Sequence, residues 1–242
     1  MNNIIKLENV TYSAGGFTIL QDISARVDNG DIIFIAGRSG SGKSSLLKIC
    51  AGLNYPTAGD VYIRGVSVRK ATNSQMRDLH ENNGFVFQDC ALISNMTIYQ
   101  NLELPLRYNN ICPENEMKDR IDAMLSSLQL QDDRHNRPAQ LSLGEKRLAA
   151  IGRTIINHPD LIYLDEPLVS LDSTHVKKIV DILLALKEKK TTMILISHRT
   201  RLIKDIGSHL WIIDNGRLSY SGRTADQETL DYAIQNKVID PY

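Results

Sequence analysis

The chain is 242 residues long and 42% hydrophobic, which is enough for one large domain with a substantial core. Its 28 Lys and Arg residues balance its 28 Asp and Glu residues, so a broad basic surface and a nucleic-acid partner are not expected. Cys50, Cys90 and Cys112 lack the spacing of a metal site, which predicts reduced thiols in a reducing compartment. The amino-terminal residues do not resemble a signal peptide and no run is long enough to span a membrane, which predicts a chain that does not cross a membrane by itself but can dock on a protein that does.

Short apolar runs alternate with helical patterns, which predicts an α/β protein with a buried, mostly parallel sheet. Strands are expected at residues 4–12, 17–27, 32–36, 60–64, 84–87, 161–164, 193–196, 209–213 and 217–220. Helices are expected at residues 43–51, 74–81, 97–108, 114–128, 142–157, 173–189 and 224–236, with a further short helix before residue 209. The helices between residues 88 and 158 interrupt the alternation, so this segment is expected to be a helical insertion.

Residues 37–44, Gly-Arg-Ser-Gly-Ser-Gly-Lys-Ser, fit the phosphate-binding pattern G-x-x-x-x-G-K-[ST] between a predicted strand and a predicted helix. Glycines let the backbone curl around phosphate oxygens, and the helix adds the positive end of its dipole. Lys43 is predicted to contact the β- and γ-phosphates, and Ser44 to ligate Mg²⁺. The alternative, a glycine-rich turn that happens to hold a lysine, lacks a reason for the flanking strand and helix. The residues expected to bind nucleotide here are Gly37, Arg38, Ser39, Gly40, Ser41, Gly42, Lys43, Ser44 and Ser45.

A second motif, Leu-Ile-Tyr-Leu-Asp-Glu-Pro at residues 161–167, places two carboxylates at the end of a predicted strand. Open α/β sheets bind their ligands at this edge. Asp165 is therefore predicted to hold Mg²⁺, directly or through water. Glu166 is predicted to accept a proton from the water that attacks the γ-phosphate. The alternative is a solvated turn that happens to carry two acidic residues. The presence of the phosphate loop in the same chain disfavours this alternative.

These two motifs resemble the nucleotide-binding subunit of an ATP-binding cassette (ABC) transporter, and the resemblance covers roughly residues 4 to 222. It implies ATP and Mg²⁺ as cofactors and ATP hydrolysis as the activity. It also implies a single domain with a P-loop NTPase core, a mostly parallel sheet and an N-terminal antiparallel β subdomain. The core and β subdomain would occupy residues 1–87 and 159–222, with a helical subdomain at 88–158 and a helical tail at 223–242.

The family pattern also gives roles to four single residues. Tyr12 lies where the family has an aromatic residue that stacks on adenine, although alone it would be an ordinary strand tyrosine. Gln88 matches a glutamine that reaches Mg²⁺ and the attacking water. Asp172 belongs to a loop that crosses the dimer interface, and it would equally cap the next helix. His198 matches a histidine that contacts the γ-phosphate and positions Glu166, whereas an isolated histidine is usually structural.

The family's signature segment, usually Leu-Ser-Gly-Gly-Gln, reads Leu-Ser-Leu-Gly-Glu at residues 141–145. The resemblance implies that Ser142 and Gly144 face the γ-phosphate bound by a second copy, so that two chains enclose two nucleotides. Leu143 replaces a glycine that permits close approach. Glu145 replaces a neutral amide, and a carboxylate at about 6 Å from the phosphate would cost on the order of 1–3 kcal/mol. Either the neighbouring basic residues offset this repulsion or Glu145 points away.

Residues 87–106 resemble the ATPase of Mla-type phospholipid transporters, which works with a permease and a lipid-carrying MCE-domain protein. Lipoprotein-release and cell-division ATPases share parts of this pattern. The expected partners are therefore a second copy, a permease and an MCE-domain protein, at the cytoplasmic face of the inner membrane. The apolar surface expected to receive a permease helix consists of Cys90, Leu92, Ile93, Met96 and Ile98. The alternative is that the segment around Pro105 is merely a kinked amphipathic helix.

Three functions are compatible with these motifs. The first is the energising subunit of a membrane transporter, with a lipid as its cargo. The second is a regulatory ABC ATPase of the cell-division type. The third is a nucleotide-binding module that has lost catalysis, which only the altered signature favours because Glu166 and His198 are both present.

Overall fold

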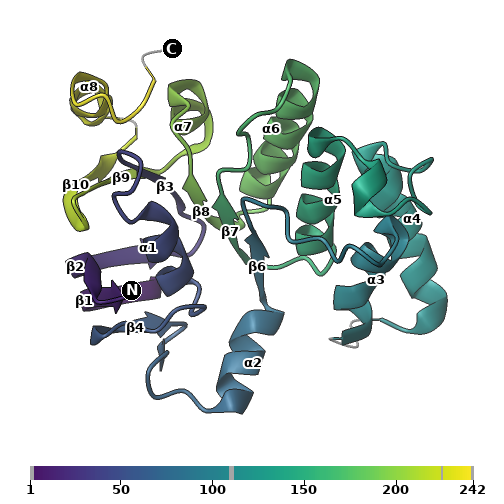
Figure 1. The fold of residues 1–242 in the computed structure, drawn as a ribbon, viewed down its shortest axis with the longest axis horizontal. Coiled ribbons are helices and arrows are strands. Elements are labelled where there is room, and N and C mark those ends of the chain that lie inside the picture. The colour runs from purple at the N-terminus through teal and green to yellow at the C-terminus, as the bar shows by residue number, and fades with distance from the viewer. Residues whose placement is uncertain (1–2, 109–111, 225, 241–242) are drawn as a thin grey trace.

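A six-stranded sheet forms the centre of the protein (Figure 1), whose computed structural model describes residues 3–108, 112–224 and 226–240. The strand order is β10-β9-β3-β8-β7-β6, and every neighbouring pair is parallel except β9 with β10. All residues of β3, β7 and β8 are buried, as their continuous apolar runs predicted. The strands are β3 (Ile32–Ala36), β6 (Asn83–Val86), β7 (Leu161–Asp165), β8 (Thr192–Ile196), β9 (His209–Asp214) and β10 (Arg217–Arg223).

A second, antiparallel sheet lies at the N-terminal side, with the strand order β2-β1-β4-β5. Its strands are β1 (Asn3–Ala14), β2 (Phe17–Asp28), β4 (Ala58–Ile63) and β5 (Val66–Ser67). The two-residue strand β5 was not predicted, because two residues show no alternation of apolar and polar side chains. The antiparallel N-terminal sheet that the family resemblance implied is confirmed.

The helices fall close to the expected segments, with ends that differ by a few residues. They are α1 (Lys43–Cys50), α2 (Asn73–Glu81), α3 (Ile98–Tyr108), α4 (Glu114–Leu128), α5 (Leu143–Ile155), α6 (Ser173–Glu188), α7 (Thr200–Ile206) and α8 (Gln227–Gln235), with a 3₁₀ turn at η1 (Pro138–Gln140). Helices α3, α4 and α5 pack together beside β6, so the helical insertion is a subdomain next to the sheet (Figure 1). Within the described ranges, no helix has the length and apolar character needed to cross a bilayer.

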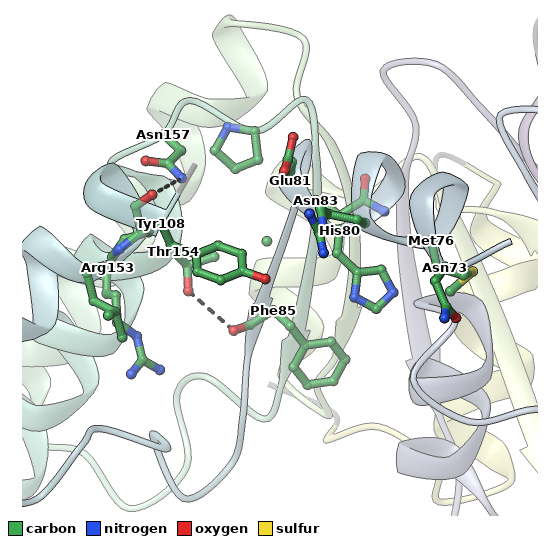
Figure 2. A pocket seen from close by; sticks show the side chains of 15 residues that line it. Asn73, Met76, His80, Glu81, Asn83, Phe85, Tyr108, Arg153, Thr154 and Asn157 are labelled. Carbon is green, nitrogen blue, oxygen red and sulfur yellow. Dashed lines mark hydrogen bonds between the residues drawn. The ribbon is translucent and has the colours of Figure 1, made fainter. Parts of the chain in front are cut away.

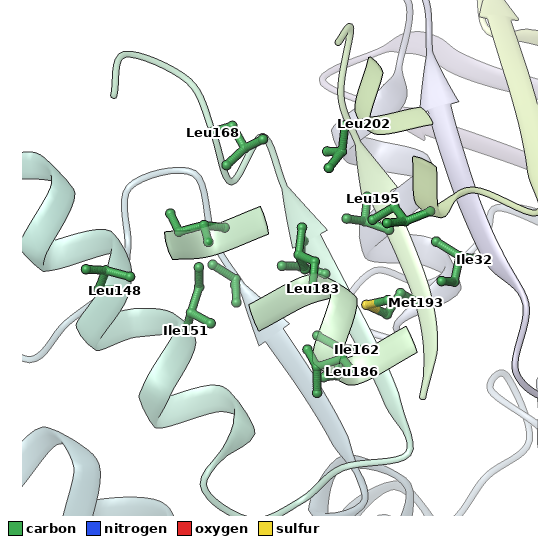
Figure 3. Close-up of a cluster of buried hydrophobic side chains, with 14 of the residues drawn as sticks. Ile32, Leu148, Ile151, Ile162, Leu168, Leu183, Leu186, Met193, Leu195 and Leu202 are labelled. Carbon is green, nitrogen blue, oxygen red and sulfur yellow. The ribbon is translucent and has the colours of Figure 1, made fainter. Parts of the chain in front are cut away.

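Each face of the central sheet carries its own hydrophobic core, because successive strand residues point to opposite faces. On one face, Ile32, Met193 and Leu195 pack with Leu183 and Leu186 of α6, as Figure 3 shows. On the other face, Ile33, Ile35, Ile194 and Ile196 pack with α1 and the antiparallel sheet. Because both faces are covered, the sheet can present polar groups only beyond its edges and strand ends.

The prediction of an apolar surface that receives a permease helix is wrong for two of its five residues. Ile98 has no exposed surface and Cys90 is 3% exposed, so neither side chain is available to a partner. The other three residues of this expected surface, Leu92, Ile93 and Met96, are half-buried. Burial also raises the pKa of the Cys90 thiol. The sequence pattern could not separate an apolar surface from the core below it.

Candidate nucleotide-binding site

The phosphate loop follows β3 and ends at α1, and two of its glycines are required by close contacts. A Cβ atom on Gly37 would lie 2.2 Å from the carbonyl oxygen of Ile213. Gly42 has a φ of 103°, and a Cβ there would lie 2.8 Å from Leu20. Neither position tolerates a side chain without moving a neighbouring segment. The loop is therefore held in its curled shape by β2 and β9 as well as by its own sequence.

The Lys43 ammonium group folds over this loop. Its Nζ donates hydrogen bonds to the carbonyl oxygens of Gly37 at 2.7 Å and Arg38 at 2.9 Å. Burial lowers the pKa of Lys43, and the carboxylates of Glu166 and Asp165 oppose this shift. A cation kept at the centre of a curled backbone loop is suited to neutralise a phosphate group.

The remaining loop residues surround this lysine. Ser41 is buried, and its hydroxyl has no hydrogen-bond partner among the described residues. Buried polar atoms are normally paired, so an unpaired hydroxyl in this loop fits a site built for a polar ligand. A cavity of about 290 Å³ lies beside the loop, between it and residues of β9 and α8. The other predicted members that line this cavity are Gly37, Arg38, Ser39 and Gly40, while Ser45 lies within α1.

Ser44 and Asp165 meet where the first turn of α1 faces the end of β7. The Ser44 hydroxyl donates to Asp165 Oδ1 at 3.2 Å, and Asp165 is only 4% exposed. Burial raises the pKa of Asp165, while the hydrogen bond from Ser44 opposes that shift. Hard oxygen ligands that keep space for water suit Mg²⁺, and these two residues with Gln88 line a cavity of about 380 Å³. The residues present therefore fit the expected cation.

Gln88 and Glu166 also meet, although 78 positions separate them in the chain. The amide Nε2 of Gln88 donates to Glu166 Oε2 at 3.2 Å. Glu166 has a φ of 49°, a backbone conformation that few residues other than glycine adopt, and it turns the chain sharply after β7. Strained backbone of this kind is maintained where the surrounding structure fixes it and is concentrated at functional sites.

His198 and Tyr12 occupy defined positions outside this cluster. His198 follows β8, and its Nδ1 lies 2.8 Å from the carbonyl oxygen of Val238 near the C-terminus. Tyr12 lies on β1 half-buried against the core of α1 and the antiparallel sheet, and its hydroxyl accepts a hydrogen bond from Asn54 at 3.2 Å. The structure therefore gives Tyr12 a packing role, and adenine stacking by Tyr12 stays a prediction.

The altered signature segment forms a capping box at the start of α5. The hydroxyl of Ser142 accepts from the backbone N–H of Glu145 at 3.3 Å, and the Glu145 carboxylate accepts from the backbone N–H of Ser142 at 2.7 Å. These hydrogen bonds with Ser142 lower the pKa of Glu145. The sequence left two possibilities, that neighbouring basic residues offset the charge of Glu145 or that Glu145 points away. The structure shows the carboxylate turned back onto the start of its own helix. Leu143 is 44% exposed beside it.

Sequence reasoning missed His175, which connects two of the predicted segments. Asp172 caps α6 by accepting from the backbone N–H groups of Thr174 and His175, and its other oxygen lies 2.6 Å from His175 Nδ1. These contacts, first the His175 backbone and then its side chain, lower the pKa of Asp172. The His175 ring also lies against Gly144, where a Cβ would approach its Cγ to 2.3 Å. The i, i+3 spacing of Asp172 and His175 was the available signal.

A buried arginine joins α5 to the segment before Gln88. Arg147 is 2% exposed and donates through Nη1 to the carbonyl oxygen of Phe87 at 3.1 Å. A buried guanidinium is costly unless it is hydrogen-bonded, so this contact fixes α5 against that segment. This role could not be predicted from the sequence, because Arg147 looks like any other charged residue of the predicted helix.

A curled glycine loop on a buried strand, with a lysine over it and an acid at the next strand but one, defines a P-loop nucleoside triphosphatase. Residues 20–169 match the family model described as ABC transporter. The chain belongs to the ABC transporter family and has the fold of an ABC cassette. Cassettes of this family bind ATP with Mg²⁺ and hydrolyse it to drive transport.

Two relatives and one solved structure illustrate the similarity. The methionine import ATP-binding protein MetN 2 of Bacillus cereus is 31% identical over 228 residues, which cover 93% of this chain and 66% of the relative. This chain thus spans about two thirds of the length of that relative. The lipoprotein-releasing system ATP-binding protein LolD of Aquifex aeolicus is 36% identical over 203 residues, 84% of this chain and 90% of LolD. A dimeric structure of the cassette MJ0796 bound to ADP and Pi has a TM-score of 0.84 at 29% identity, covering 92% of this chain and 99% of that one.

We expect Gly144→Ala to destabilise the protein by about 1–3 kcal/mol, because the new methyl group would overlap the His175 ring. In a His175→Ala background the same change should be neutral or stabilising by about 0.5–1 kcal/mol, since alanine favours the helix. Urea unfolding of the four proteins in this cycle measures the coupling. Equal costs in both backgrounds would contradict the contact.

Proposed function

We propose that this chain is the ATP-hydrolysing subunit of a membrane transporter for lipids. The observation that carries the enzymatic part is the convergence of Lys43, Ser44, Asp165, Gln88 and Glu166 at one edge of the sheet. Lys43 and Ser44 would hold the phosphates and Mg²⁺, and Asp165 would be the carboxylate beside the cation. The cation would supply charge neutralisation at the phosphates.

Glu166 is proposed as the general base. The Gln88 amide donates to one of its carboxylate oxygens, and Gln88 itself lines the cavity shared by Ser44 and Asp165. A carboxylate held this way accepts the proton of a water molecule as that water attacks the γ-phosphate. His198 would contact the same phosphate from the end of β8. Glu166 and His198 together are the reason to prefer a working ATPase over a module that has lost catalysis.

A second copy of the chain is proposed to complete each site. Ser142 and Gly144 stand at the start of α5, where the helix dipole favours an anion. Asp172 begins α6 next to them and is joined to Gly144 through His175. The dimeric form of the MJ0796 cassette, with ADP and Pi bound, supports an arrangement in which these residues act on the partner's nucleotide.

A groove between α2, β6, α3 and α5 is the proposed seat of the permease (Figure 2). Its volume is about 560 Å³, and apolar side chains including Met76, Phe85 and Tyr108 line it. Tyr108 is 69% exposed, so its ring is available at the rim. A short amphipathic helix from a membrane partner would bury such a surface. The groove replaces the Cys90 and Ile98 surface that the sequence had predicted.

Asn83 gives this groove a polar recognition group. Both its Oδ1 and its Nδ2 are buried and have no hydrogen-bond partner among the described residues. An unpaired buried amide is costly, and a partner that offers one donor and one acceptor would satisfy both ends. A short helix in a permease loop carries free backbone N–H groups at its first turn and free carbonyl oxygens at its last turn, so each end of such a helix could pair with one end of the Asn83 amide.

The cargo is proposed to be a phospholipid or another lipid, on the resemblance of residues 87–106 to Mla-type ATPases. An MCE-domain protein would then be a further partner, and the chain would work at the cytoplasmic face of the inner membrane. The second candidate is release of lipid-anchored protein, which the similarity to LolD of Aquifex aeolicus favours. The methionine import relatives have the lower identity over a larger share of this chain.

Glu166→Gln should reduce ATP turnover by about 10²–10⁴-fold and leave ATP binding intact, because the amide cannot accept the proton. Asp89→Asn is the matched control, since Asp89 lines the same cavity without a proposed role in proton transfer. Steady-state phosphate release and nucleotide binding measure the two effects. Unchanged hydrolysis in Glu166→Gln would remove Glu166 as the base.

Leu143→Gly should raise turnover if the exposed leucine keeps the partner's phosphate from approaching Ser142. Relief of about 1 kcal/mol in the barrier corresponds to about a fivefold increase in rate. Leu143→Ala should give an intermediate value, and phosphate release at saturating ATP is the measurement. A loss of activity in both variants would refute crowding as the cause.

The cargo is tested by isolating the chain from its native membrane with the permease attached. Mass spectrometry should then detect phospholipid in the complex, and Phe85→Asp in the proposed groove should abolish recovery of the permease. Tyr55→Asp is the control, because Tyr55 is exposed outside the groove. Lipid-modified protein in place of phospholipid would favour the second candidate.

A further inference from the structure

The last described residues fold back across the loop that carries His198. Helix α8 ends at Gln235, and the backbone N–H of Val238 returns to the carbonyl oxygen of Ala233 at 2.9 Å. Val238 is 7% exposed and Ile239 is 4% exposed, so their side chains anchor the segment in the core. In Figure 1 the described segment after α8 runs between α8 and α7.

Three hydrogen bonds fix residues 238–240, which we call the C-terminal strap, to the loop after β8. The carbonyl oxygen of Val238 lies 2.8 Å from His198 Nδ1. The backbone N–H of Asp240 donates to the carbonyl oxygen of His198 at 2.9 Å. The Thr200 hydroxyl donates to the carbonyl oxygen of Asp240. Both the backbone and the ring of His198 are thus held by the strap.

The chemistry of the Val238 contact determines which ring nitrogen carries the proton. A backbone carbonyl can only accept, so Nδ1 must be the donor. The hydrogen bond made by one ring nitrogen sets the state of the other, which leaves Nε2 as the free nitrogen. In the neutral ring Nε2 carries a lone pair, and phosphate oxygens are also acceptors. The ring therefore donates to phosphate from Nε2 only after it gains a second proton, a form that the Val238 carbonyl accepts from equally well.

We propose that the C-terminal strap is a positioning element for His198, which fixes the ring and its Nδ1 proton so that Nε2 faces the phosphate. This inference rests on the proposed function, because it assigns His198 to the γ-phosphate. The strap holds His198 through the Val238 carbonyl, and Val238 also lines the cavity beside the phosphate loop. A strap that only covered the core would have no reason to place a carbonyl on the ring nitrogen.

The first experiment measures the tautomer directly. The chain contains six histidines, and the ¹⁵N signals of His198 are assigned by their loss in His198→Gln. In the full chain, at a pH where the rings are neutral, His198 should carry its proton on Nδ1. Removal of residues 238–242 should shift the proton toward Nε2, the form that a free imidazole favours, while removal of 241–242 alone should not. A proton on Nε2 in the full chain would overturn the proposal, whatever His198 does in catalysis.

The second experiment separates positioning from general stability. Removal of residues 238–242 should lower ATP turnover by about tenfold in the native background, because misplaced groups lose most of their contribution. It should cause a clearly smaller loss in His198→Gln, since the part of the effect that passes through the ring is already absent there, whereas the loss of Val238 from the cavity wall is common to both backgrounds. Equal losses in both backgrounds would show a merely structural role and overturn the proposal.

The variant Thr200→Val replaces the shortened chain in both experiments if the shortened chain fails to fold. It removes the hydroxyl that holds Asp240 and keeps the volume of the side chain. The same tautomer shift and the same dependence on His198 are expected, and their absence would contradict the strap's role. If His198→Gln itself leaves turnover unchanged, the proposed contact with phosphate fails, and the tautomer measurement still decides whether the strap fixes the ring.

Discussion

The register of three parallel strands sets the position of every group in the candidate site. In β3, β8 and β7, Ile35 lies beside Ile196 and Ile196 lies beside Asp165. The phosphate loop, the His198 loop and the Asp165–Glu166 pair therefore leave the sheet at one level and on one edge. A slip of one residue in any strand would send its side chains to the opposite face and displace its loop. The hydrophobic cores on both faces make such a slip costly, so packing far from the edge determines the chemistry at the edge.

The charges at this edge depend on one another. Lys43 and Asp165 are both largely buried, and burial disfavours the charged form of each. For Lys43 the carboxylates of Glu166 and Asp165 oppose this shift of the pKa, and for Asp165 the Ser44 hydrogen bond and the nearby lysine charges do so. Without a phosphate group, Lys43 is satisfied by the carbonyl oxygens of its own loop. A triphosphate would offer the same ammonium group ionised oxygens in place of carbonyl oxygens, and a hydrogen bond between two ionised groups is the stronger one.

Local patterns predicted the parts of this protein that local physics determines. The phosphate loop, the paired carboxylates and the buried strands follow from glycine placement and continuous apolar runs within a few residues. The failures came where a long-range contact decided the outcome. Cys90 and Ile98 look like surface apolar residues in the sequence but are buried in the fold, and His175 looks structural until Gly144 lies against its ring. The Val238 carbonyl could not be predicted at all, because every residue has one and only the fold places it at His198.

The signature segment and the phosphate loop make no contact with each other among the described hydrogen bonds and cavities. In the part of the chain that the structure describes, the hydrogen bonds of Ser142 and Asp172 stay within their own helix starts. Neither residue lines the cavities beside the phosphate loop or around Asp165. A capped helix start with its dipole directed outward is a site for an anion that this chain's own loop does not present to it. Cassettes of this family dimerise, and a head-to-tail pair would bring the start of α5 in one copy to the phosphate loop of the other with the same surfaces used twice. The proposed contact of His198 with phosphate would belong to the half of such a site that carries the phosphate loop, since the loop after β8 leaves the sheet beside β3.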